Sequence, residues 1–263
     1  MNHYAIVLEY LGKNYFGWQK QKNRISVQET VEKALSKIAN HKVSIVCAGR
    51  TDSGVHATAQ VISFSTHSIR SIRCWLLGTN TYLPKEIRIV DVYRVNRFFN
   101  ARFSANYRVY NYLIYQGRYE NIIAYQYSLQ IRRKLDLESM NESCQFLLGE
   151  KDFSSFRSSK CQSKSSFRQV QSAHFKSYGD FIIFEIKANA FLYHMVLNIM
   201  GAFLEIGLCK KNILWFKEFL LNKKRDRAPR AAPENGLYLV EVGYKDYPFI
   251  KSKRSLKNYF YFS

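Results

Sequence analysis

Short apolar stretches alternate with polar turns along the whole chain, a pattern that predicts a mixed fold of strands and helices. A helix is expected from Ser26 to about Ile38, because Ser26-Val27-Gln28-Glu29 is a capping-box signature and the apolar residues that follow recur along one helical face. The other elements predicted in the first half are strands at 3–10, 43–47, 59–64 and 87–95 and a short helix at 71–77.

The second half repeats this order of elements. The helix expected from Phe191 to about Ile206 is apolar almost all round, which predicts a central position. Two similar halves predict a pseudo-two-fold α/β (α+β) fold with a cleft between the halves. The remaining elements expected here are a strand at 108–115, a helix at about 136–148 that ends at Gly149, and strands at 167–175 and 181–187. The expected parts are an N-terminal half at 1–105, a C-terminal half at 106–244 and a basic, aromatic tail at 245–263.

The charge of the chain indicates a polyanionic partner. Forty Lys and Arg against twenty Asp and Glu give a formal net charge of +20 over 263 residues. Self-repulsion of this size destabilises a compact protein, and a nucleic acid is the simplest partner that balances it. The 19 Tyr and 19 Phe supply rings on which bases can stack, although most are expected in the core. A hydrophobic content of 47% excludes a disordered chain and suffices for one large or two ordinary domains.

Several other classes of protein are disfavoured. There is no apolar run of about eighteen residues, and the first residues lead directly into a strand pattern, so we expect no membrane span, no signal peptide and a cytoplasmic protein. The 5 cysteines lack any C-x-x-C spacing, which predicts free, mainly buried thiols and no zinc site. His56 and His194 belong to no metal-ligand pattern, so hydrogen-bonded structural roles are favoured over metal binding for both.

The candidate chemistry lies in the stretch Ala48-Gly49-Arg50-Thr51-Asp52-Ser53-Gly54-Val55-His56-Ala57. A loop that follows a buried strand holds its side chains on a rigid support, and glycines let it bend tightly. Arg50 and Asp52 are spaced to lie on one side, where the arginine keeps the carboxylate ionised. A bare R-x-D pair is usually an ordinary surface ion pair. Asp52-Ser53-Gly54 also matches the D-S-G of aspartic proteases, but those enzymes need two such carboxylates and the chain has one such motif.

The ten-residue stretch as a whole resembles the active-site loop G-R-T-D-x-G-V-H-A of the TruA-type tRNA pseudouridine synthases. Further segments resemble motifs of the same family in the same order, so that the resemblance covers roughly residues 15 to 239. These segments are Tyr15–Gln21 (Y-x-G-W-Q-x-Q), Phe99–Ala105 (F-x-A-R-x-x-A), Arg108–Tyr112 (R-x-Y-x-Y), Gly149–Phe156 (G-x-x-D-F-x-x-F), Asn189–Gly201 (N-x-F-L-x-H-M-V-R-N-I-x-G) and Ala232–Leu239 (A-P-x-x-G-L-x-L).

The resemblance implies a pseudouridine synthase fold, with a mixed, mainly antiparallel sheet flanked by helices and a central active-site cleft. It also implies that a homodimer isomerises uridine to pseudouridine at positions 38–40 of the tRNA anticodon stem-loop, without metal or small-molecule cofactor. Asp52 would be the nucleophile, Tyr110 would stack on the target uracil and take its proton, and Arg50 would occupy the place of the flipped nucleotide. Attack at C1′, attack at C6 and a glycal route all stay open. Substrate contacts are expected from Phe16, Trp18, Gln19, Gln21, His56, Arg102, Arg108 and His194.

One position departs from the family pattern. Leu197 stands where the family has an arginine that lies against the catalytic carboxylate, which favours, as an alternative, a tRNA-binding or chaperone-like protein with weakened chemistry. Otherwise Arg50 or another basic residue takes over that charge. A phosphodiesterase or glycosylase is disfavoured, because metal-binding carboxylate clusters are missing. The tail at 245–263 matches no family motif and is either an additional RNA contact or disordered.

Overall fold

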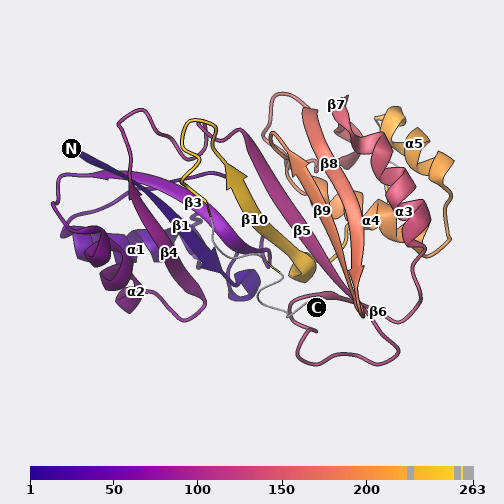
Figure 1. Cartoon of the computed structure of the whole chain (residues 1–263), viewed down its shortest axis with the longest axis horizontal. Helices are drawn as coiled ribbons and strands as arrows, with labels where there is room; N and C mark the ends of the chain where they lie inside the picture. The colour runs from indigo at the N-terminus through magenta and orange to yellow at the C-terminus, as the bar shows by residue number, and fades with distance from the viewer. Residues whose placement is uncertain (224–227, 252–255, 257–263) are drawn as a thin grey trace. The chain divides into compact units, whose positions relative to one another are not determined.

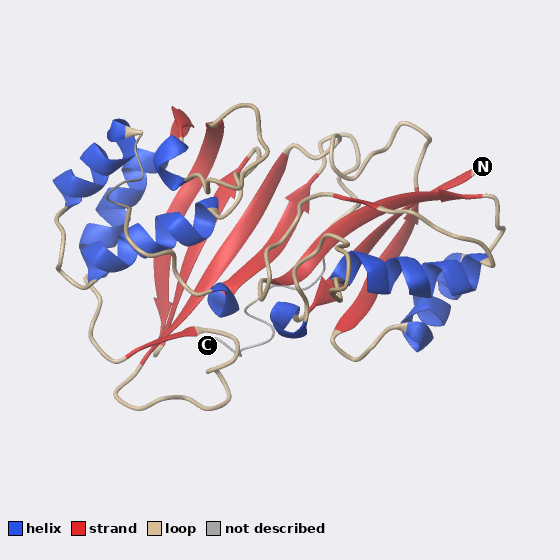
Figure 2. Ribbon diagram, turned by 180° about the vertical axis from the view of Figure 1, so that it is seen from behind, coloured by secondary structure: helices blue, strands red, loops and turns tan. Residues whose placement is uncertain are grey.

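The computed structural model describes residues 1–223, 228–251 and 256, which form two compact units. The first unit comprises Met1–Arg108 and the described residues from Tyr238 onward, and the second comprises the described part of Val109–Leu237. Each unit combines a mainly antiparallel sheet with helices that gather on one side of it (Figures 1 and 2). The mixed α/β fold class predicted from the sequence is therefore confirmed.

The sheet of the first unit has the strand order β4-β1-β3-β10. Strand β3 pairs antiparallel with β1 and with the short β2, β1 pairs antiparallel with β4, and β10 pairs parallel with β3, bringing Tyr238 opposite His56. Trp75 is fully buried against Tyr4 and Phe64, which fixes the helical layer on β1 and β3. The strands are β1 (Asn2–Tyr10), β2 (Val46–Cys47), β3 (His56–Thr66), β4 (Ile87–Arg94) and β10 (Leu237–Gly243). The helices are the 3-10 helix Gly12–Asn14, α1 (Val27–Ala39), the π-helical turn Cys74–Gly78 and α2 (Thr79–Tyr82).

The second unit is built around the apolar helix α4. Phe203 of this helix is fully buried and packs against Phe175 and Phe184 of the sheet on one side and Phe216 of α5 on the other. The sheet has the order β5-β9-β8-β7, with β6 parallel to β5. Its strands are β5 (Tyr107–Gln116), β6 (Leu129–Ile131), β7 (Gly149–Asp152), β8 (Phe167–Tyr178) and β9 (Phe181–Ala188). The helices are α3 (Leu137–Cys144), α4 (Met195–Gly207), α5 (Ile213–Asn222) and 3-10 turns at Gln145–Leu147, Ser154–Phe156 and Glu234–Gly236.

Two element predictions need correction. The strand expected at 43–47 is reduced to β2, because backbone N–H groups at its start bond to side chains of α1 instead of to a neighbouring strand. Val43 N donates to Ser36 Oγ, and Ile45 N donates to Glu32 Oε1. The helix expected from Phe191 begins only at Met195, because His194 has a left-handed backbone (φ 61°) that cannot continue into a helix.

The division of the chain also differs from the expected one. The compact units divide at Arg108, where residue 105 was expected, and the first unit includes the last strand, which pairs with β3. Of the expected tail, the described start packs on the first unit: Lys245 N donates to Asn106 Oδ1 and Tyr247 OH to Asn96 Oδ1. Most of the tail from Ser252 onward lies outside the described residues.

Candidate active site

Asp52 lies on a tight turn between β2 and β3, in a segment that we call the Asp52 loop (residues 48–55). Val55 N donates to Asp52 O at 3.2 Å, and Gly54 has a φ of +81°, a conformation that favours glycine. Asp52 is half-buried and Arg50 is exposed. The turn therefore presents a carboxylate at the end of a strand with an arginine two residues before it.

The segment 12–18 supports this loop through backbone contacts. Trp18 N donates to Thr51 O at 3.0 Å, and Ser53 Oγ donates to Tyr15 O at 3.2 Å. Gly17 has a φ of +80°, and a Cβ there would lie 2.9 Å from Thr51 O. The two segments approach too closely for any side chain at this position.

The closest approach between the two segments is at Gly12. Replacing Gly12 by alanine is expected to lower the free energy of unfolding by about 2 kcal/mol or more. A Cβ at Gly12 would overlap the backbone carbonyl of Val55, which cannot rotate away as a side chain would. Urea unfolding measures the change. Gly179→Ala is the control, because it introduces strain at a φ of +56° with nothing within 4 Å. A cost for Gly12→Ala no larger than that of the control would contradict close packing here.

A buried glutamine on β3 holds the Asp52 loop through hydrogen bonds to its backbone. Gln60 is fully buried on β3; its Nε2 donates to Gly49 O at 2.6 Å and its Oε1 accepts from Gly49 N at 3.4 Å. Tyr10 OH is 2.8 Å from Thr51 Oγ1 in the same network. Buried polar groups that satisfy one another in this way specify a single loop conformation.

Arg108 fixes the start of the loop. It is 8% exposed, and its Nε and Nη2 donate to Ala48 O at 3.2 and 2.8 Å. The same guanidinium donates to Arg102 O at 2.8 Å and to Ala105 O at 3.1 Å. One buried side chain thus joins the Asp52 loop to the turn that precedes β5.

The arginines near the loop also act on Cys47. Burial raises the pKa of this thiol to about 11, and the positive charges of Arg50, Arg102 and Arg108 act in the opposite direction. Cys47 is therefore protonated at neutral pH. All 5 cysteines are free; Cys144 is buried, Cys47, Cys74 and Cys161 are half-buried and Cys209 is exposed, so the expectation of mainly buried thiols is wrong.

The second unit carries Tyr110 and His194. Tyr110 lies on β5 and is 7% exposed, and its ring meets that of Phe191 edge-on at 5.0 Å. His194 precedes α4, with its ring 4.3 Å from that of Tyr193. Leu197, in the first turn of α4, is 1% exposed. The residue at the family's arginine position is thus packed as an apolar core residue.

The comparisons identify the family. A family model described as tRNA pseudouridine synthase matches residues 6–104 and 144–245, which include the Asp52 loop, β10 and α4. The chain is 47% identical over 249 residues to proteins named tRNA pseudouridine synthase A from Francisella tularensis subsp. holarctica (strain FTNF002-00 / FTA) and Francisella philomiragia subsp. philomiragia. These alignments cover 95% of this chain and 96% of each relative. The chain belongs to the tRNA pseudouridine synthase family.

It is accordingly an isomerase that modifies uridine in tRNA. Among solved structures, a chain of the archaeal box H/ACA sRNP Nop10-Cbf5 complex aligns at 10% identity with a TM-score of 0.36, covering 76% of this chain and 44% of that chain. That likeness is too weak to carry an argument. Tyr110 and Arg108 lie between the two segments matched by the family model, so their assignment depends on the R-x-Y-x-Y stretch.

In the synthase, three residues that were expected to contact the substrate are buried and pack or hydrogen-bond within the protein. Trp18 is 2% exposed and packs against Tyr10, 5.9 Å between ring centroids. His56 is 1% exposed, accepts from Gly12 N at Nδ1 (3.0 Å) and stacks on Tyr238 at 4.8 Å. Arg108 donates to backbone carbonyls as described above. We assign these three side chains to holding the Asp52 loop rather than to contacting RNA.

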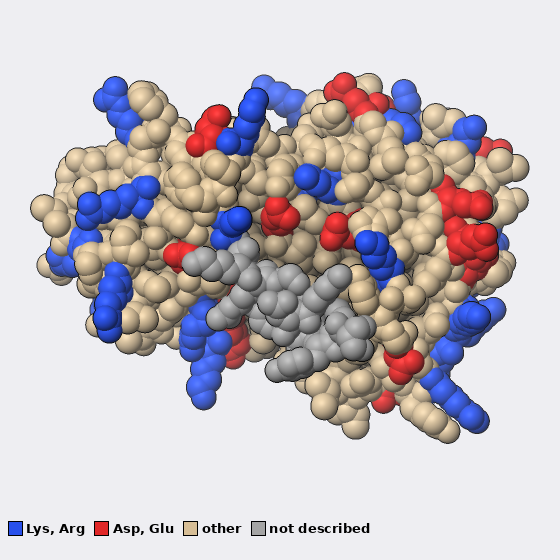
Figure 3. Space-filling view, in the orientation of Figure 1, with Lys and Arg blue, Asp and Glu red and all other residues tan. Residues whose placement is uncertain are grey.

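The other expected contacts of the first unit are accessible. Gln19, Gln21 and Arg102 are exposed, and Phe16 is 47% exposed with the guanidinium of Arg24 4.7 Å from its ring centroid. On the face drawn in Figure 3, Lys and Arg side chains are spread over the described surface instead of forming one patch.

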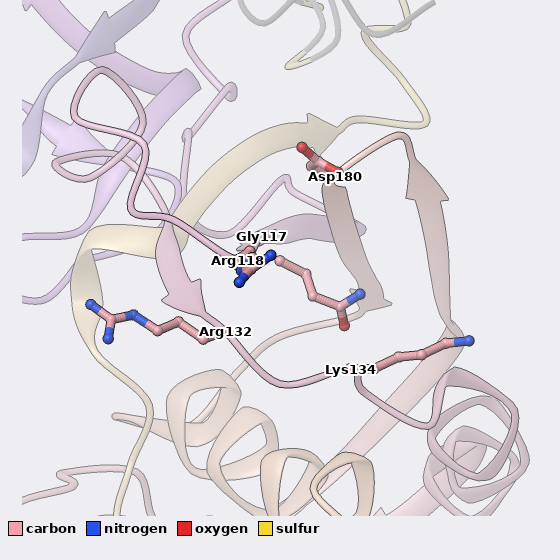
Figure 4. Close-up of a pocket in the computed structure, with 6 residues that line it drawn as sticks. Gly117, Arg118, Arg132, Lys134 and Asp180 are labelled. Carbon is pink, nitrogen blue, oxygen red and sulfur yellow. The ribbon is translucent and has the colours of Figure 1, made fainter.

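A separate, shallow surface pocket of about 370 Å³ lies in the second unit, and none of the expected site residues line it. Figure 4 shows that Arg132 and Lys134 extend away from each other, and Arg132 is paired with Glu120 at 3.0 Å. The positively charged side chains of this pocket therefore do not converge on a common point where one ligand could bind. Its lining residues are Gln116, Gly117, Arg118, Arg132, Lys134 and Asp180.

Two absences hold for the described part of the chain. No group of three or more His, Cys, Asp or Glu side chains is placed there to hold a metal ion. None of the helices in the ranges 1–223 and 228–251 has the length and apolar character needed to cross a membrane.

Proposed function

We propose that the protein converts uridine to pseudouridine at positions 38–40 of the tRNA anticodon stem-loop, as a cytoplasmic homodimer that needs no cofactor, with Asp52 as the nucleophile. The observation that carries the proposal is the half-buried carboxylate of Asp52, held on a rigid turn beside Arg50 within the family's G-R-T-D-S-G-V-H-A sequence. A carboxylate is able to add to, or shield, an electrophilic carbon.

The proposed reaction is balanced within the substrate. The C1′–N1 bond breaks, the uracil turns, the C1′–C5 bond forms, the C5 proton leaves to solvent and N1 gains a proton. Asp52 adds to C1′ or to C6, or supports a glycal route. Tyr110 stacks on the uracil and removes the C5 proton, directly or through water.

The target uridine must leave its stack before Asp52 can reach it. Unstacking costs a few kcal/mol, and Arg50 fills the vacated position. Arg50 suits this role because it is exposed and lies two residues from Asp52. The formal charge of +20 contributes phosphate binding without sequence preference, so affinity for tRNA falls as salt rises.

Leu197 supports the one alternative that we retain, a tRNA-binding protein with weakened chemistry. This buried, apolar side chain supplies no positive charge at that point of α4. In the proposed enzyme Arg50 or another basic residue supplies the charge next to Asp52.

Mapping the product tests the proposal. Unmodified tRNA transcripts are incubated with the purified protein in excess EDTA, and pseudouridine is located by carbodiimide derivatisation and primer extension. We expect label at positions 38–40 only, and its loss when those uridines are replaced by cytidine. Label elsewhere contradicts the assigned positions, and tRNA binding without label supports the weakened-chemistry alternative.

A further inference from the structure

Two exposed phenylalanines lie on one short turn of the first unit, residues 96–104. Phe98 is 75% exposed and Phe103 is 78% exposed. Each has an arginine guanidinium over its ring, since Arg97 Cζ is 4.9 Å from the Phe98 centroid and Arg102 Cζ is 5.3 Å from the Phe103 centroid. Single exposed rings are common on protein surfaces, but here two rings lie within six residues and each is paired with a guanidinium.

The turn is held rigid by two asparagines used in the same way. Asn96 Oδ1 accepts from the backbone N–H groups of Phe98 and Phe99, at 3.0 and 3.1 Å. Asn100 Oδ1 accepts from those of Arg102 and Phe103, also at 3.0 and 3.1 Å. Each asparagine therefore presents one Arg-Phe dipeptide in a fixed backbone conformation.

The buried side of the turn anchors it to the sheet. Phe99 is 7% exposed and packs against Tyr244 and Tyr247, at 5.1 and 4.8 Å between ring centroids. Ala101 N donates to Ser63 Oγ on β3, and Ala101 O accepts from Tyr244 OH. The rings at 98 and 103 thus point outward from a supported frame, which lowers the entropy that binding must overcome.

The same turn is tied to the Asp52 loop. Arg108 donates both to Arg102 O, within the turn, and to Ala48 O, at the start of the loop. A nucleotide bound at the turn would therefore lie at a fixed offset from the reacting nucleotide at Asp52.

We infer that Phe98 and Phe103 are stacking platforms for unpaired bases of the bound tRNA, separate from the target uridine. Bases stack on exposed aromatic rings, and an adjacent guanidinium both stacks and neutralises phosphate. Residues 94–104 contain three arginines and no Asp or Glu, which matches a polyanion better than an apolar protein surface. The inference rests on the proposed tRNA substrate and assigns a binding role to two residues that the chemistry does not use.

The test measures the affinity for a fluorescein-labelled tRNA transcript by anisotropy. Phe98→Leu and Phe103→Leu each keep the apolar surface but remove the ring, and we expect affinity to fall between about fivefold and a hundredfold. The salt dependence of binding stays unchanged, because the lost interaction is uncharged. Phe103→Trp keeps a ring at this position and retains affinity, and the added indole fluorescence is quenched when tRNA binds. Tyr82→Leu, which removes a 59% exposed ring from α2 of the same unit, is the control and leaves affinity unchanged.

The outcomes separate this inference from the proposed function. Wild-type affinity in both leucine variants overturns the stacking role while leaving tRNA as the substrate. Altered sedimentation of the variants with unaltered tRNA affinity overturns it in favour of a protein partner at this surface. If the wild-type protein itself binds no tRNA, the proposed function fails and the stacking role fails with it.

Discussion

Replacing Asp52 by asparagine is expected to lower the single-turnover rate of pseudouridine formation by at least about a thousandfold. The amide has nearly the same shape as the carboxylate but cannot act as a nucleophile or stabilise positive charge at the sugar. The loop should keep its conformation, because it is held through Gly49 O, Thr51 O and the hydroxyl of Ser53, which the substitution leaves in place. Nucleoside analysis of rapidly quenched reactions measures the rate.

The matched control is Asp246→Asn, which removes an exposed carboxylate from the same unit. It should react at the wild-type rate. The Asp52 variant should bind tRNA within about threefold of wild type, because phosphate contacts supply most of the affinity. A rate loss of less than about tenfold would exclude Asp52 as the nucleophile.

Replacing Arg108 by methionine is expected to lower the free energy of unfolding by about 3 to 5 kcal/mol. Methionine fills much of the space but donates nothing, so the carbonyls of Ala48, Arg102 and Ala105 lose their buried donor. Each buried acceptor left without a partner costs about 1 to 3 kcal/mol. Urea unfolding at neutral pH measures the change.

Two variants show whether the guanidinium fork is responsible. Arg94→Met removes an exposed arginine of the same unit and should change stability by less than about 0.5 kcal/mol. Arg108→Lys keeps the charge but cannot donate to all three carbonyls, so it should lose less stability than Arg108→Met but more than none. If Arg108→Met were as stable as wild type and weakened only tRNA binding, Arg108 would be a substrate contact, as the sequence first predicted, and not a structural residue.

Local signals in the sequence predicted most of the elements. The Ser26 cap appears as expected, with Ser26 Oγ accepting from Glu29 N before α1. The strand at 43–47 was overestimated because its amides bond to side chains of α1, a tertiary interaction that the apolar pattern does not reveal. Helix α5 was missed although it carried a signal: Asn212 caps Trp215 N, and Phe216, Phe219 and Leu220 recur at helical spacing.

The site was predicted less completely than the fold. Asp52 and Arg50 were identified from a motif, but the roles of Trp18 and Arg108 depend on which way each side chain faces. Tryptophan and arginine are typical of RNA contacts, yet here both are buried under the loop. Gln60 was overlooked, although a glutamine at the centre of an apolar strand is itself a signal, because a buried amide needs partners.

Release of tritium from uridine C5 tests the central claim most directly. The wild-type protein is incubated with tRNA transcripts carrying tritium at C5. Three quantities are then measured separately in the same reaction: tritium released to water, pseudouridine formed and free uracil. The account predicts one tritium released for each pseudouridine formed, and no free uracil. Bound tRNA without tritium release, or release accompanied by free uracil, would contradict isomerisation at Asp52.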